Sequence, residues 1–257
     1  MTNSHEQLGD FLRSRRARLK PEQLGLPGTG RRRTAGLRRE EVASAARISA
    51  EWYVKLEQGR AVAPSPATIE ALAHALLLDD VDRAHLRSLA RTTRRAPFVR
   101  EEVPETIRRL IKSFTHPAYV TGQRWDVLAW NSAAAELLCD FDQLAIKDRN
   151  ILLCMLTDPR ARKLFGGQWA EEAQRMVALF RSTHDLFAGD PTFIELISRL
   201  RAGCREFDTW WSTHDVRSPV SGTKTLHHPS RGRLSFEYAS FQANDDPRLK
   251  VAIYLTD

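Results

Sequence analysis

Apolar residues recur at helical spacing in the first third of the chain. The pattern is typical of short amphipathic helices and covers residues 7–19, 37–60, 65–77 and 81–91. The stretch 37–60 contains two such helices, because Ser49 is a common helix N-cap and Gly59 a common helix stop. We therefore expect five short helices that pack together as an all-α domain.

The two helices of residues 37–60 have the features of a helix-turn-helix. Ala43 and Ala46 are small enough to let the two helix axes approach closely. In a helix-turn-helix the first helix braces the second, which presents its N-terminal half to a DNA major groove. A plain helical hairpin would show the same apolar pattern, so the surrounding charge has to decide between the two.

Positive charge is concentrated in this helical part of the chain. The 257 residues carry a formal net charge of +7. Residues 1–100 contain 19 Lys and Arg against 11 Asp and Glu, whereas residues 101–257 contain 20 against 21. A basic unit joined to a near-neutral one indicates a polyanion binder joined to a second function. Nucleic acid is the expected polyanion, because no basic amphipathic helix stands apart as one on a membrane surface would.

The side chains expected to contact DNA come from the second helix and from the arginines before it. Lys55 can donate to guanine or phosphate, and Glu51 can accept from a cytosine amino group. The arginine run in the Gly- and Pro-rich loop of residues 21–36 can follow a phosphate backbone, or can simply be solvated. The candidates, of which those in the second helix should face outward, are Arg31, Arg32, Arg33, Arg38, Arg39, Ser49, Ala50, Glu51, Trp52 and Lys55.

A charged connector separates the helical domain from a second domain with a mixed pattern. We place the helix-turn-helix domain at residues 1–95, the linker at 96–103 and the second domain at 104–257. Strand-like alternation occurs in residues 117–121, 125–130, 224–228, 233–242 and 249–256, with helical spacing between the second and third of these. The second domain is therefore expected to be an α+β unit with a five-stranded antiparallel sheet.

Cysteine content and hydropathy indicate the compartment. Cys139, Cys154 and Cys204 are few and scattered among apolar residues, which argues against a disulfide framework and a zinc site. The N-terminus has no apolar signal core, and no run of about 18 apolar residues would span a membrane. We therefore expect reduced thiols in a cytoplasmic protein, associated with the nucleoid.

Residues 8–91 resemble the helix-turn-helix domain of the XRE family of bacterial regulators. The resemblance lies in Ile48-Ser49, Trp52-Tyr53, Leu56-Glu57 and Gly59. The insert GLPGTGRRRTAGLRREEVA is similar to an arginine loop of the MmyB-like regulators. The segments AYVTGQRWDVLAWN, RNILLCMLTDP, FDTWWSTHDVR and SGTKTLHHP resemble the C-terminal ligand-binding domain of the same group.

This resemblance implies a lambda-repressor-like helical domain and a PAS-like α+β domain that binds a fatty-acyl-like ligand. Two residues depart from the pattern. Arg47 stands where the family usually has Gly in the turn, so it must take a backbone conformation that glycine adopts more easily. Arg39 stands where a Gln often begins the first helix of the motif, and it keeps a phosphate contact plausible.

A pocket between helices and sheet is the expected ligand site, although an ordinary filled core would give the same sequence pattern. Aromatic side chains would line it, and polar ones at its mouth would bind an acidic head group. The candidates are Trp125, Trp130, Asn131, Phe180, Trp210, His214, Arg217 and Phe236.

Catalysis is not expected. His214-Asp215, Asp126 and Ser221 share no catalytic spacing, and the adjacent His227 and His228 should point to opposite faces of a strand. We therefore expect no enzyme activity, cofactor or metal, and a homodimeric transcription regulator that binds double-stranded DNA and a small apolar ligand. Two alternatives stay open: a regulator whose second domain only dimerises, and an enzyme or interaction module that its basic domain holds on DNA.

Overall fold

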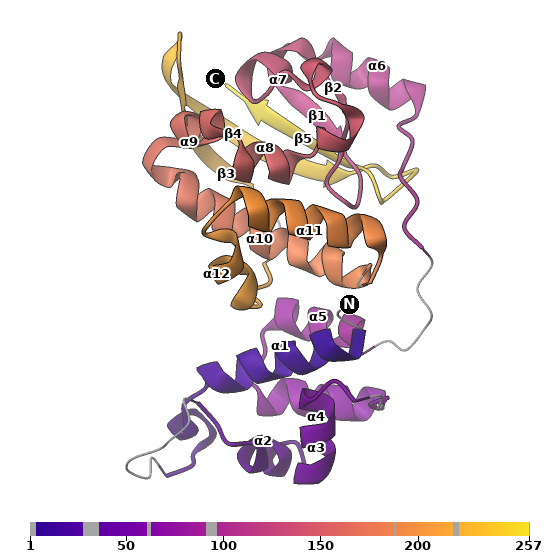
Figure 1. Ribbon diagram of the computed structural model, residues 1–257, viewed down its shortest axis with the longest axis vertical. Helices are drawn as coiled ribbons and strands as arrows, with labels where there is room; N and C mark the ends of the chain where they lie inside the picture. The colour runs from indigo at the N-terminus through magenta and orange to yellow at the C-terminus, as the bar shows by residue number, and fades with distance from the viewer. Residues whose placement is uncertain are drawn as a thin grey trace. The chain divides into compact units, whose positions relative to one another are not determined.

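The computed structural model describes residues 4–27, 36–60, 63–90, 97–187, 189–217 and 221–256. The chain forms two compact units (Figure 1). The first comprises Met1–Pro97 together with His184–Pro191 and Ser212–Val216, and the second holds the remainder. Arg31, Arg32 and Arg33 lie outside the described residues.

The N-terminal part of the first unit is helical, as predicted. Its helices are α1 (Ser4–Arg18), the 3-10 turn η1 (Pro21–Leu24), α2 (Arg39–Ala45), α3 (Ala50–Glu57), α4 (Pro66–Ala75) and α5 (Asp80–Leu89). Side-chain oxygens of Ser49, Ser65 and Asp79 cap α3, α4 and α5 by accepting from backbone N–H groups.

One apolar core joins these helices. Each of the helices α1 to α5 contributes at least one fully buried side chain to this core, among them Leu12, Val42, Tyr53, Leu72 and Leu86. A short helix is marginal by itself in water. The helix pair α2–α3 is therefore held in place by burial against α1, α4 and α5.

The second unit alternates short strands and helices. It contains α6 (Glu105–Ser113), β1 (Ala118–Thr121), β2 (Val127–Trp130), α7 (Ser132–Leu137), η2 (Phe141–Gln143), η3 (Ile146–Asp148), α8 (Ile151–Thr157), α9 (Pro159–Phe165) and η4 (Gly166–Gln168). It continues with α10 (Trp169–Leu186), whose last residues belong to the first unit, α11 (Pro191–Gly203), α12 (Phe207–Ser212), β3 (Gly222–His228), β4 (Gly232–Gln242) and β5 (Lys250–Leu255).

The five strands form one antiparallel sheet in the order β2-β1-β5-β4-β3. The predicted α+β class and five-stranded antiparallel sheet are confirmed. The pairing of β1 with β5 joins the β1–β2 pair to the three C-terminal strands, and it places Thr121 directly opposite Lys250.

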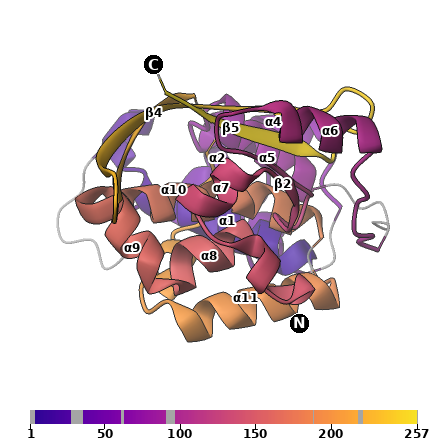
Figure 2. The same cartoon turned by 90° about the horizontal axis from the view of Figure 1, so that it is seen from above.

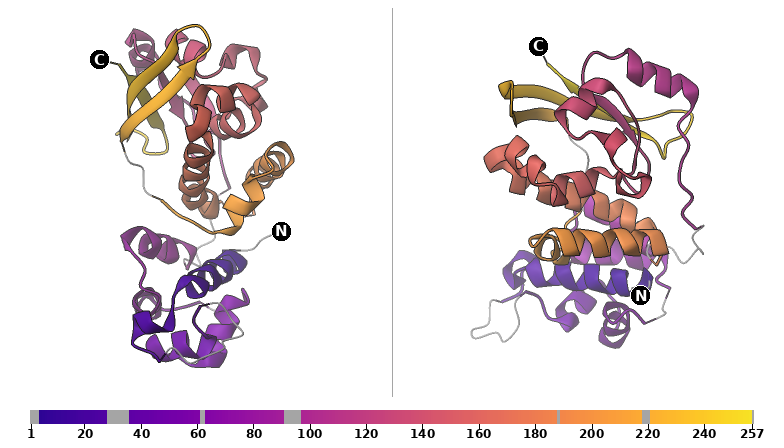
Figure 3. Two further views of the ribbon diagram at one scale, coloured as in Figure 1. Left: turned by 90° about the vertical axis from the view of Figure 1, so that its left-hand side faces the viewer. Right: turned by 45° about the horizontal axis from the view of Figure 1, so that its top comes forward.

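The two faces of the sheet have different neighbours, because side chains alternate along each strand. On β1 and β5, Val120 and Val251 pack on Ile111 of α6. The alternate positions, such as Tyr119 and Tyr254, face the helices that follow β2. Figure 2 shows the strands of this unit with α8, α9 and α10 on one side, and Figure 3 shows the same layers from two further directions.

No helix in the described ranges is both long and apolar enough to cross a lipid bilayer.

Candidate functional site

The turn between α2 and α3 fixes the geometry of the helix pair. The φ angle of Arg47 is 55°, so this residue takes the left-handed conformation expected from its place in the turn. The N–H of Ile48 then donates to the carbonyl of Ala43 at 2.9 Å, and the hydroxyl of Ser49 accepts from the N–H of Trp52 at 3.2 Å. The chain thus reverses within four residues and starts α3 with a capped end.

A buried carboxylate holds α3 against the two neighbouring helices. The side chain of Glu57 is fully buried, and its two oxygens lie 2.5 Å from Arg16 Nε of α1 and 2.5 Å from Arg39 Nε of α2. Burial opposes the charge of Glu57, but the hydrogen bonds from Arg16 and Arg39 outweigh it, so the pKa of Glu57 is lowered. The carbonyl of Glu57 also accepts from Arg13 at 2.9 Å.

This ion cluster changes the interpretation of Arg39, which the sequence offered as a phosphate contact. Its guanidinium is engaged with Glu57, although 41% of the side chain stays exposed. Arg38, the residue before it, is exposed and N-caps α2, where its own N–H donates to Glu41 Oε2 at 2.7 Å. Arg38 is therefore the freer cation of the two.

Fewer side chains of α3 face outward than predicted. Glu51 is exposed, and Lys55 pairs with it across one helical turn at 2.8 Å. Ala50 and Trp52, which were expected to face outward, are half-buried against the core. An indole at the start of a short helix gains more by covering the edge of a core than by standing in water. Among the candidates in the described residues, Arg38, Ser49 and Glu51 are exposed, and Arg39 and Lys55 stay partly exposed although each is in an ion pair.

The second unit contains an apolar pocket between its sheet and its helices. Strand side chains form one wall, and the helices α8, α9 and α10 form the other. The lining residues are Tyr119, Thr121, Trp125, Leu138, Ile151, Cys154, Met155, Ala161, Leu164, Phe165, Glu172, Arg175, Met176, Leu179, Lys224, Tyr238, Ser240, Lys250, Ala252 and Tyr254.

Four charged side chains interrupt this apolar lining. The carboxylate of Glu172 lies 2.6 Å from Arg175 and 2.6 Å from Lys224, so these three groups compensate one another in part. Burial lowers the pKa of Lys224, while Glu172 opposes the shift. Burial alone lowers the pKa of Lys250. No acidic side chain of the described ranges pairs with Lys250, whose ammonium lies 5.7 Å from the centre of the Trp125 ring.

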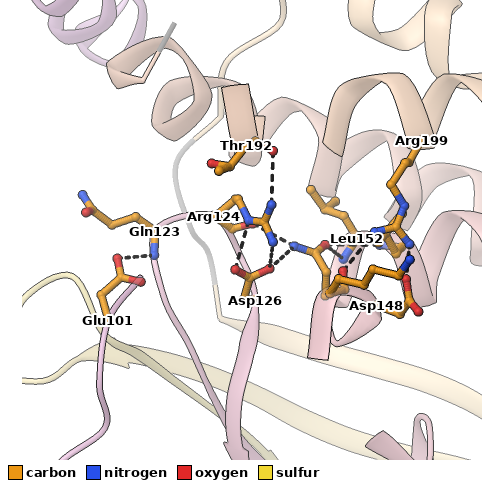
Figure 4. A network of polar contacts seen from close by, with 11 residues as sticks. Glu101, Gln123, Arg124, Asp126, Asp148, Leu152, Thr192 and Arg199 are labelled. Carbon is orange, nitrogen blue, oxygen red and sulfur yellow. Dashed lines mark hydrogen bonds and ion pairs between the residues drawn. The ribbon is translucent and has the colours of Figure 1, made fainter. Parts of the chain in front are cut away.

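A network of polar contacts, drawn in Figure 4 around Arg124 and Asp126, braces the turn between β1 and β2 that carries Trp125. Trp125 has a φ of 66° in the turn between β1 and β2, a conformation that its neighbours must hold. Arg124 and Asp126 form two hydrogen bonds of 2.9 and 3.0 Å. Asn150 donates to Asp126 at 3.1 Å and to the carbonyl of Arg124 at 2.9 Å, and its own oxygen caps α8.

The same network extends to α11. Arg124 donates to the carbonyl of Thr192 at 3.1 Å, and Arg199 pairs with Asp148 (Figure 4). On the other side of the turn, the N–H of Gln123 donates to the buried carboxylate of Glu101 at 3.0 Å. The turn that carries Trp125 is therefore braced from several elements of the second unit.

Comparison with known proteins assigns both units. Residues 7–86 match a helix-turn-helix domain family. Residues 103–257, more than half of the chain, match the MmyB-like transcription regulator ligand binding domain. The chain belongs to this family of MmyB-like regulators. It is a DNA-binding transcription regulator with a ligand-binding domain. No curated protein matches the chain.

Of the ligand residues expected from the sequence, only Trp125 lines the pocket of this MmyB-like regulator. Asn131 is buried and caps α7, and it also bonds the backbone of Phe114, His116 and Ala118. His214 groups with the first unit, and Arg217 is exposed outside the pocket.

The other expected aromatic residues pack on one another. The Trp130 ring lies on Phe141 at 5.4 Å, Phe180 stacks on Phe193 at 6.0 Å, and Trp210 contacts Trp169 at 5.7 Å. Phe236 meets Tyr254 at 5.9 Å but lines a different hollow. Large rings bury most area in a filled core, so their size alone did not mark the pocket.

Sequence reasoning missed the charged residues of the pocket. Lys224 and Lys250 stand at alternating strand positions that point inward, and Glu172 lies one turn before Met176 on the inner face of α10. A charged residue at a strand position that faces the core would have indicated the pocket. The sequence alone leaves open which alternate positions of each strand face the core.

Among the described residues, no three His, Cys, Asp or Glu side chains converge as metal ligands do.

Proposed function

We propose that this MmyB-like regulator binds operator DNA as a homodimer and that its ligand is a single-chain amphipathic anion such as a fatty acid. Ligand in the pocket of the second unit would change the affinity for DNA. One observation supports the ligand class most strongly: Lys250 is largely buried in an apolar pocket with no acidic partner in the described part of the chain.

An unpaired buried cation is unfavourable, and an anion that arrives with the ligand would relieve that cost. Thr121 pairs with Lys250 across β1 and β5, and both side chains line the pocket, so they are neighbours on one face of the sheet. Trp125 lies against the same lysine and closes the position on its apolar side. These three side chains form a head-group position for a carboxylate.

The remainder of the pocket suits an alkyl chain. Its apolar surface comes from helices on one side and includes Leu138, Ile151, Met155, Leu164, Phe165, Met176 and Leu179. Glu172 forms ion pairs with Arg175 and Lys224, so these two cations should attract the anionic group of the ligand less strongly than Lys250 does. One cation without an acidic partner in the described residues, together with an apolar wall, favours an amphipathic anion with one chain.

The ligand class can be tested with hexadecanoate and hexadecan-1-ol, which share a chain but differ in charge. By calorimetry, the wild type should bind the acid more tightly than the alcohol. Lys250→Met should weaken hexadecanoate binding about 10- to 100-fold, since a hydrogen bond to a charged group contributes about 1.5–3 kcal/mol. Lys163→Met removes an exposed lysine outside the pocket and should bind as the wild type does.

Two outcomes would contradict the ligand proposal. One is equal affinity of the wild type for the acid and the alcohol. The other is a wild type that binds neither compound and, in native mass spectrometry after purification, carries no small molecule. The second outcome would favour a second unit that only dimerises.

DNA binding is tested by titrating genomic operator fragments at rising salt. The logarithm of the affinity should fall linearly with the logarithm of salt concentration, because phosphate contacts release counterions. Arg38→Ala and Lys55→Ala should each reduce the slope by about 1 if they contact phosphate. A dimer should protect half-sites about 34 Å apart. Such a regulator works in the cytoplasm, at the nucleoid.

A further inference from the structure

The pocket of the second unit contains a second polar position, apart from the head-group position. Lys224 of β3 and Arg175 of α10 both bind the carboxylate of Glu172, at 2.6 Å in each case. The ammonium of Lys224 also lies 3.9 Å from the centre of the Tyr238 ring and 5.5 Å from that of Tyr254. All five side chains line the pocket, and together they form what we call the second polar position.

Strand β5 gives the distance between the two polar positions. Lys250 and Tyr254 are four residues apart on this strand, and they line the pocket with Ala252 between them. At about 3.3 Å per residue, their Cα atoms are ~13 Å apart. Ala252 is opposite Tyr119 on β1 and opposite Ser240 on β4. The smallest of these side chains therefore stands midway along the path from one polar position to the other.

Lys224 can still bind a group that enters the pocket. An ammonium group has three N–H donors, and in the described part of the chain Glu172 is the acidic residue that pairs with Lys224. Tyr238 and Tyr254 each carry a hydroxyl group that can donate or accept. Burial raises the pKa of both tyrosines, so both keep their protons at neutral pH. The second polar position thus offers several donors to a ligand oxygen.

The charges of the second polar position favour a neutral oxygen over a second carboxylate. Arg175 and Lys224 carry two positive charges against the one negative charge of Glu172. A ligand carboxylate would meet Glu172 at close range, where like charges repel. A plain alkyl segment would leave the remaining donors of Lys224 without an acceptor. A hydroxyl oxygen can accept from Lys224 and leave both ion pairs in place.

The separation of the two positions fixes where on the ligand this oxygen belongs. An extended alkyl chain with C–C bonds of ~1.5 Å advances about 1.25 Å per carbon, so ~13 Å corresponds to about ten carbons. We propose that the ligand is a long-chain hydroxy acid whose carboxylate binds Lys250 and whose hydroxyl group, about ten carbons along the chain, binds Lys224. This inference rests on the proposed function, because it takes Lys250 as the site of the carboxylate.

The proposal is tested by calorimetry on the full-length protein with octadecanoate, 10-hydroxyoctadecanoate and 18-hydroxyoctadecanoate. The wild type should bind the 10-hydroxy acid about 10- to 100-fold more tightly than octadecanoate, as expected for a hydrogen bond to a charged group. The 18-hydroxy acid should show no such gain, because its hydroxyl group lies beyond the second polar position. The three acids share one chain length and one carboxylate, so the comparison isolates the place of the hydroxyl group.

Variants assign the gain to Lys224. Lys224→Met and Lys224→Gln should each remove the preference for the 10-hydroxy acid, and the use of two neutral replacements guards against a folding defect in one. Lys250→Met should weaken the binding of both acids while it keeps their ratio. Lys163→Met, on the exposed surface outside the pocket, should bind both acids as the wild type does.

Three results would overturn the hydroxy-acid proposal: equal affinity of the wild type for octadecanoate and the 10-hydroxy acid, an equal gain for the 18-hydroxy acid, or a gain that persists in both Lys224 variants. In each of these cases octadecanoate still binds, so the proposed function stands. A wild type that binds none of the three acids would instead refute the proposed function, and the hydroxy-acid proposal with it.

Discussion

Replacing Glu57 with Gln should loosen α3 from its two supporting helices. The change keeps the size of the side chain and removes the charge that pairs with Arg16 and Arg39. Breaking a buried ion pair on one side costs about 3–5 kcal/mol. Two features reduce that figure: the amide still accepts one hydrogen bond, and Arg39 is 41% exposed, so water screens its contribution. We expect about 2–4 kcal/mol.

The loss should be local, so it is best measured by hydrogen exchange on the full-length protein, peptide by peptide. Amides of α2 and α3 should exchange about 30- to 1,000-fold faster in Glu57→Gln than in the wild type, since about 1.4 kcal/mol corresponds to a factor of ten. Glu51→Gln is the matched control. It makes the same change on the same helix, but the side chain is 80% exposed, and exchange should not change measurably.

The difference in hydrogen exchange between wild type and Glu57→Gln should depend on pH in a defined direction. The pKa of Glu57 is lowered in the folded protein, so its pairing contributes stability above the pKa of an exposed glutamate, about 4.3. That stability is lost as the pH falls through the folded pKa. The difference between wild type and Glu57→Gln should be constant from pH 7 to pH 5 and shrink below about pH 4. Equal exchange in the two proteins at pH 7 would refute the role of Glu57.

Three further changes test the turn between α2 and α3, the contacts of Asn150, and the head-group position of the pocket. Arg47→Gly should stabilise the first unit by about 1 kcal/mol in urea denaturation, because glycine takes a φ of 55° without a Cβ clash; a loss of stability would contradict this. Asn150→Ala should accelerate exchange in α8 by removing its cap and the contact to Asp126, whereas Asn244→Ala, in an exposed turn, should not. Thr121→Val should weaken hexadecanoate binding about 10- to 100-fold in calorimetry, because the hydroxyl would donate to a charged carboxylate, and an unchanged affinity would remove it from the head-group position.

Local signals in the sequence were sufficient for most of the fold. Caps such as Ser49, Asn150 and Asp158 act on the next few residues, so their effect can be predicted without knowing the rest of the chain. The positive φ of Arg47 was expected from the family resemblance, because the family usually has Gly at this position. The pairing of β1 with β5 joins residues far apart in sequence, and nothing local specifies it.

The site residues were harder to predict, because they depend on what each side chain meets in space. Asn131 could cap a helix or bind a ligand, and the structure shows the cap. Arg39 could contact phosphate or a carboxylate, and Glu57 lies one helix further on in the chain. Lys250 became a candidate only when the structure showed that it pairs with Thr121 across two strands and that both residues line the pocket.

The central claim is that an anion in the pocket controls DNA binding. Its most direct test is the Kd for an operator fragment, selected in vitro from genomic DNA, measured with and without saturating hexadecanoate. Coupling between two sites is typically about 1–3 kcal/mol, so the wild-type Kd should change about 5- to 150-fold. Lys250→Met at the same concentration should show little change. An operator Kd that is the same with and without bound hexadecanoate would contradict the account.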